Sequence, residues 1–88
     1  MPLVIVEYAF DPPITQEEFD VLAEKTSDCL DARQATWVTS YFSLDRRRRI
    51  CVFEAQDAEA VRQAYRMAGT KFERVWAAEQ ILDDDEET

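Results

Sequence analysis

Segments with the hydrophobic pattern of a strand alternate along this 88-residue chain with segments that have the pattern of a helix. The order of these segments constrains the fold more than any other feature. The segment "LVIVEYAF" at 3–10 is rich in β-branched and aromatic residues, which predicts a strand. Thr15 and Glu18 then form a capping-box pattern, T-x-x-E. Apolar residues at helical spacing follow this pattern and predict an amphipathic helix over 16–31.

The second half of the chain carries the same kinds of signal. The segments "TWVTSYFS" (36–43) and "RICVFEA" (49–55) predict two strands joined by a hairpin. Asp57 is placed to cap a second helix, which Gly69 ends, and a fourth strand is expected at 74–82. The order β-α-β-β-α-β predicts an α+β, ferredoxin-like sandwich. Its four-stranded antiparallel sheet would have the order 4-1-3-2, with both helices on one face.

Two shortages in composition exclude common kinds of site. The chain has no histidine, which removes the commonest general base and the commonest metal ligand. Gly69 is the only glycine, so no Gly-rich phosphate-binding loop can form. Without histidine, Cys29 and Cys51 also lack the usual partner of a nucleophilic thiol, and we expect both to be inert free thiols.

Charge and hydropathy limit the partners of the chain. The formal net charge is −9, and five acidic residues lie at 83–87. We therefore expect a domain over 1–82 and a disordered acidic tail at 83–88. This balance argues against nucleic acid as a partner. The sequence has no membrane-spanning segment and no signal-peptide pattern, so we expect a cytoplasmic protein without membrane contact.

Side-chain alternation along the strands sorts residues between the two faces of the sheet. On the first strand, Val4, Val6 and Tyr8 should face the helices, which sends Leu3, Ile5, Glu7 and Ala9 to the open face. On the third strand, Cys51, Phe53 and Ala55 should face the helices, which sends Ile50, Val52 and Glu54 to the open face. We also assign to the open face, from the second strand, Trp37, Thr39, Tyr41 and Ser43, and from the fourth, Val75, Ala77, Glu79 and Ile81.

An open face of this composition is too apolar to be bare in a monomer. We expect a second copy to cover it in an isologous homodimer. Carboxylates would then lie beside a partly apolar cavity and could hold a cation or a small ligand. The alternative is that each glutamate pairs with an arginine across the dimer interface or lies at the solvated edge of that interface. The candidate ligand-binding residues are Glu7, Trp37, Tyr41, Arg48 and Glu54, and the candidate metal ligands are Glu7 and Glu54.

Four consecutive arginines, Arg46 to Arg49, precede the third strand. RNA-recognition motifs share the expected element order, but they carry stacking aromatic residues on the open face of the first and third strands. Glu7 and Glu54 stand there instead, so RNA binding is not expected. Charge at a hairpin end also discourages edge-to-edge aggregation. A phosphate or carboxylate ligand held by Arg48 or Arg49 is the functional alternative.

Several short elements together resemble a family of small bacterial domains, over about residues 3 to 82. These are V-E-x-x-F with Glu7, W-x-x-S-Y with Trp37 and Tyr41, and C-V-[YF]-E-A with Cys51 and Glu54, followed by A-E-A-V-R. The family was formerly a domain of unknown function and is now described as nickel-binding, ferredoxin-like proteins. The resemblance implies a ferredoxin-like fold, a homo-oligomer, no assigned enzymatic activity, and an ion or ligand site on the sheet.

The resemblance makes nickel or another divalent cation the expected cofactor, if there is one. Imidazole is a favoured ligand of Ni²⁺, so a nickel site of the family type cannot be carried over intact to a chain without histidine. Glu7, Tyr41 and Glu54 match family positions and would remain. We expect a non-enzymatic protein with a cation or small-ligand site on the open face. The alternatives are a small dimeric α+β barrel-like enzyme, with Glu7 or Glu54 as general base, and a partner-binding module.

Overall fold

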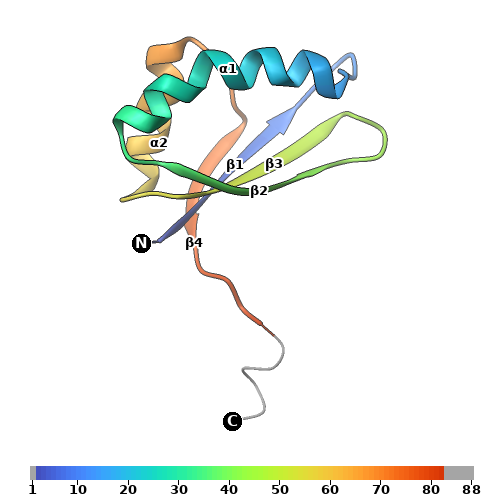
Figure 1. Cartoon of the computed structure of the whole chain (residues 1–88). Coiled ribbons are helices and arrows are strands. Elements are labelled where there is room, and N and C mark those ends of the chain that lie inside the picture. The colour runs from blue at the N-terminus through green and yellow to red at the C-terminus, as the bar shows by residue number, and fades with distance from the viewer. Residues whose placement is uncertain (1, 83–88) are drawn as a thin grey trace.

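The computed structural model describes residues 2–82, which form two layers (Figure 1). A sheet makes one layer, and both helices lie on the same side of it. The elements are the strands β1 (Leu3–Ala9), β2 (Thr36–Phe42), β3 (Arg48–Glu54) and β4 (Arg74–Ala78), and the helices α1 (Gln16–Ala32) and α2 (Ala58–Ala68). The strand order is β2-β3-β1-β4, and all three pairings are antiparallel. The predicted ferredoxin-like fold is confirmed. The predicted acidic tail at 83–88 lies outside the described residues.

The ends of both helices are set by the residues that the sequence indicates. The Thr15 hydroxyl accepts a hydrogen bond from the Glu18 backbone N–H at 3.0 Å, and the Glu18 carboxylate accepts one from the Thr15 N–H at 2.8 Å. Asp57 accepts a hydrogen bond from the Ala60 N–H at 2.8 Å and caps α2. Gly69 ends α2 with φ of 74°, a left-handed conformation that costs glycine little.

The core lies between the sheet and the two helices. Val4 and Val6 of β1 and Val61 of α2 are fully buried. Phe19 of α1 and Phe53 of β3 complete the contact between the layers. The alternation predicted for β1 and β3 is therefore confirmed. None of the helices in the described part of the chain is long and apolar enough to cross a membrane.

The predicted face of Trp37 is wrong. The alternation along β2 is broken by a bulge between Trp37 and Thr39. Trp37 lies opposite Phe53, so it shares the helix-facing side, whereas Thr39 and Tyr41 lie opposite Val52 and Ile50 on the open face. A bulge inserts one extra residue and shifts side-chain parity, which simple alternation cannot anticipate.

The predicted face of the fourth strand is also wrong. Val75 lies opposite Val6 and is 5% exposed, so it belongs to the core, and Ala77 lies opposite Val4 on the same side. Trp76 occupies the open face instead. The strand ends at Ala78, so Glu79 and Ile81, which were expected to extend it, lie beyond it. Burial of Val75 in the core decides the parity of this short strand.

Replacing Thr15 with alanine should lower the free energy of unfolding by about 1 kcal/mol, because the N–H of Glu18 would lose its capping acceptor. Urea denaturation of the full chain measures the change. Thr15→Ser keeps the hydroxyl and should retain most of the stability. Equal losses in the two variants would contradict a capping role.

Candidate functional site

The structure separates the predicted site residues between two surfaces. Four of them, Glu7, Tyr41, Arg48 and Glu54, lie on the side of the sheet that the helices leave uncovered. Trp37 lies on the other side, where it is 61% exposed at the edge of a cavity between α1 and the sheet. We call the uncovered side the open face, and it carries Leu3, Ile5, Glu7, Thr39, Tyr41, Arg48, Ile50, Val52, Glu54, Arg74, Trp76 and Ala78. We call the cavity between α1 and the sheet the helix-side cavity.

The open face combines exposed aromatic rings with charged side chains. Tyr41 is 65% exposed and Trp76 is 44% exposed. The indole N–H of Trp76 donates a hydrogen bond to Glu7 Oε2 at 2.6 Å. Arg74 is the register partner of Glu7 on β4. Sequence reasoning missed Trp76, because a large aromatic residue in an apolar strand suggests a core position.

The two candidate metal ligands do not converge within one chain. Glu54 lies opposite Leu3, four positions along β1 from Glu7. At roughly 3.4 Å per residue, this spacing separates them by about 14 Å. Residues 2–82 also contain no group of three or more Cys, Asp or Glu side chains placed to hold a metal ion. A cation could therefore contact only one of these two carboxylates from a single subunit.

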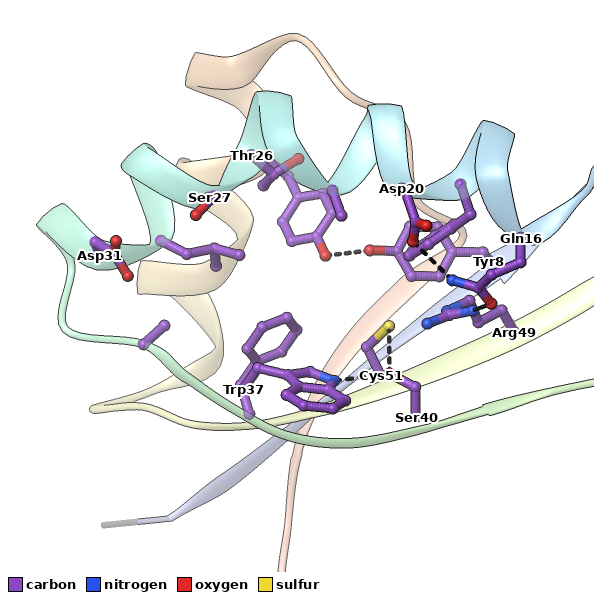
Figure 2. A pocket seen from close by; sticks show the side chains of 16 residues that line it. Tyr8, Gln16, Asp20, Thr26, Ser27, Asp31, Trp37, Ser40, Arg49 and Cys51 are labelled. Atoms are coloured by element: carbon purple, nitrogen blue, oxygen red, sulfur yellow. Dashed lines mark hydrogen bonds between the residues drawn. The ribbon is translucent and has the colours of Figure 1, made fainter.

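The helix-side cavity has a volume of about 380 Å³ and lies beneath α1 (Figure 2). A chain of hydrogen bonds follows its floor. The Trp37 indole N–H donates to Ser40 Oγ at 2.8 Å, and the Ser40 hydroxyl donates to Cys51 Sγ at 3.1 Å. Cys51 is 3% exposed, which confirms the predicted burial of this thiol.

Two buried tyrosines line this cavity and contact each other. The hydroxyls of Tyr8 and Tyr65 are hydrogen-bonded to each other. Burial raises the pKa of Tyr8 well above its ordinary value, and the neighbouring Tyr65 and Cys51 raise it further. Burial also raises the pKa of Tyr65, and this effect exceeds the opposing hydrogen bond from Tyr8. Both phenols therefore stay protonated at neutral pH.

Arg49 closes one end of the cavity. Its guanidinium carbon lies 3.9 Å from the centre of the Phe19 ring and 5.0 Å from that of Phe42. Its Nη1 donates a hydrogen bond to Gln16 Oε1 at 3.0 Å. The buried Nε of Arg49 has no hydrogen-bond partner among residues 2–82. The sequence named Arg49 as an alternative anion ligand beside Arg48, and only Arg49 lines the cavity.

The fold and these two surfaces define a small α+β protein with one uncovered sheet face and one cavity between its layers. The profile of the family described as "Nickel responsive protein SCO4226-like" matches residues 5–77, and the chain belongs to this family.

Two solved structures have a similar fold. The crystal structure of SCO4226 from Streptomyces coelicolor A3(2) matches with a TM-score of 0.77 and 14% identity, over 91% of this chain and 99% of that one. An unknown protein from Galdieria sulphuraria matches with a TM-score of 0.55 and 17% identity, over 94% of this chain and 47% of that one. No curated protein matches the chain in sequence. At these identities the structural matches support the fold alone.

The buried phenols make the protein sensitive to alkali. Because the folded state raises the pKa of Tyr8 and Tyr65 above 10.0, their stabilising effect is complete below pH 10 and is lost as the pH rises further. Unfolding by urea between about pH 8 and 11.5 should show this loss. The double variant Tyr8→Phe/Tyr65→Phe should flatten the profile. An unaltered slope in the double variant would contradict the assignment.

Proposed function

We propose that this member of the nickel-responsive family is a non-enzymatic homodimer, joined through the open face, with a weak cation or small-ligand site at the junction. The observation that supports this proposal most directly is the exposure of Trp76 and Tyr41 on a sheet face that no helix covers (Figure 1). Their rings lie beside Leu3, Ile5 and Ile50. Removing such a face from water stabilises an association.

The charges on the open face favour a second copy of the chain as the partner. Arg48 and Arg74 lie at one end of the face, beside Ala9 and Glu7, and Glu54 lies at the other end, beside Leu3. When two copies pack open face to open face about a two-fold axis, with their strands running in opposite directions, the basic end of each meets the acidic end of the other. An isologous dimer forms this contact twice.

The same arrangement of two copies would bring the two separated carboxylates, Glu7 and Glu54, close together. Within one subunit Glu7 and Glu54 are four register positions apart. In the two-fold dimer, Glu7 of one copy would lie toward Glu54 of the other. A shared site of this kind has only oxygen ligands. Such ligands suit hard cations such as Mg²⁺ and Mn²⁺ better than Ni²⁺. We therefore propose weak binding without strong preference for nickel.

The two alternatives have less support. An enzyme with a glutamate base would need that carboxylate in an enclosed site, and neither Glu7 nor Glu54 lines the helix-side cavity. A partner-binding module would need the open face to stay free in the homo-oligomer.

We also propose a cytoplasmic location. Cys29 and Cys51 are free thiols, which is consistent with a reducing compartment.

Trp76→Glu should weaken the dimer by about thirtyfold or more, because an interfacial tryptophan commonly contributes 2 kcal/mol or more to binding. Sedimentation equilibrium of the full chain measures the change. Met67→Glu is the control, since Met67 is a large exposed hydrophobic residue like Trp76 but lies on α2. A monomeric unsubstituted protein, or equal effects of the two substitutions, would contradict the proposed interface.

Calorimetric titration of the metal-free protein with Ni²⁺, Mn²⁺ and Mg²⁺ tests the cation site separately. We expect weak binding that is lost in Glu7→Ala, in Glu54→Ala and in the dissociated Trp76→Glu variant. Glu59→Ala, on α2, should bind as the unsubstituted protein does. Flat titrations from a protein that is still dimeric would refute the cation site and leave the dimer standing.

A further inference from the structure

The helix-side cavity is separate from the open face and has a distinct polar character. Its apolar walls include the rings of Phe19, Phe53 and Trp37. Figure 2 shows Arg49 and Gln16 at one end of the cavity and Asp31 at the other, below α1. Its volume of about 380 Å³ lies within the range of about 300–1,000 Å³ that is usual for small-molecule sites.

Arg49 forms no ion pair with any of the residues 2–82. The ion pairs within residues 2–82 join Arg47 to Asp11, and Arg62 and Arg66 to Glu59, so none of them involves Arg49. Its one side-chain hydrogen bond is to the neutral amide of Gln16. Because the guanidinium lies against the rings of Phe19 and Phe42, it is already oriented and would lose little freedom on binding an anion.

Five other groups that line the cavity near the sheet also have hydrogens to donate. Trp37, Ser40, Cys51, Tyr8 and Tyr65 each carry one polar hydrogen, whereas three hydrogen bonds connect them. A contact between Tyr8 and Cys51 can use a fourth hydrogen. At least one hydrogen is therefore left without an acceptor among these five groups. Together with the unpartnered Nε–H of Arg49, this leaves free hydrogen-bond donors near the sheet, whereas the acceptors of the cavity include the carboxylates of Asp20 and Asp31 on α1.

We propose that the helix-side cavity binds a small carboxylate with a flat, aromatic body. The carboxylate would accept hydrogen bonds from the guanidinium of Arg49, and the ring would lie between α1 and the aromatic floor beside Trp37. Asp31 lies at the far end of the cavity from Arg49, and its carboxylate is exposed to solvent. Asp20 lies near the Arg49 end, but its exposed carboxylate is held by the Gln16 amide at 2.7 Å, and solvent screens its charge.

The two tryptophans of the chain allow a direct test, because Trp37 lines the edge of the cavity and Trp76 lies on the open face. The full chain, labelled with ¹⁵N, is titrated with 2-naphthoate while the two indole N–H signals are followed by NMR. The variant Trp76→Phe assigns them. The expected result is a saturable shift of the Trp37 signal. No shift of Trp37 up to about 5 mM ligand, or a shift of Trp76 alone, would overturn the proposal.

The arginine run supplies matched variants for the same titration. Arg49→Gln should weaken 2-naphthoate binding by about tenfold or more, and Arg48→Gln, on the opposite face of the same strand, should not change it. The neutral analogue 2-naphthalenemethanol should bind about tenfold more weakly than the acid. Equal effects of the two arginine substitutions, or equal binding of acid and alcohol, would refute the role of Arg49.

A second variant covers the case in which Arg49→Gln fails to fold. Ser27 lines the cavity from an exposed position on α1, so Ser27→Phe should fill the space while Arg49 remains intact. Circular dichroism confirms that the variant is folded. Loss of 2-naphthoate binding is the expected result, and unchanged binding would show that the ligand does not occupy the cavity. Because these readouts do not depend on dimerisation, the test can fail while the open-face interface stands.

Discussion

Both helices of this chain cover the same face of the four-stranded sheet, and the other features of the molecule depend on that arrangement. The covered side contains the core, and the uncovered side keeps Tyr41 and Trp76 in contact with water. The covered side is also incompletely filled, because α1 spans the sheet above small residues such as Ser40 and Cys51 and leaves a cavity there. The chain therefore has two candidate binding surfaces, on opposite sides of one sheet.

The sequence predicted the fold well because local signals and the global arrangement agree. The T-x-x-E pattern begins α1, Asp57 begins α2, and Gly69 ends it, as the structure confirms. The parity of β1 and β3 also follows from alternation, because both strands are central in the sheet. The errors lie in the edge strands β2 and β4, where fewer neighbours constrain the register. A bulge near Trp37 and the short length of β4 changed the parity there.

The family relationship and the absence of histidine together limit the chemistry of this member. The chain belongs to a nickel-responsive family, yet its carboxylates Glu7 and Glu54 do not converge within one subunit, and its buried thiol Cys51 is hydrogen-bonded to Ser40. Neither group alone offers the soft or imidazole-rich ligand set that favours nickel. A binding site in this chain would therefore need several groups together. These could come from two subunits at the open face, or from Arg49 and the walls of the helix-side cavity.

The run of four arginines in an acidic chain is explained by the position of each residue at the β2–β3 hairpin. Arg46 has φ of 65°, so it forms the turn, and its guanidinium lies 4.6 Å from the Phe42 ring centre. Arg47 pairs with Asp11 at 3.3 Å on the surface, which contributes little to stability. Alternation then sends Arg48 to the open face and Arg49 to the cavity. Strand geometry thus divides this run of arginines between a turn, a surface ion pair and two separate candidate binding surfaces.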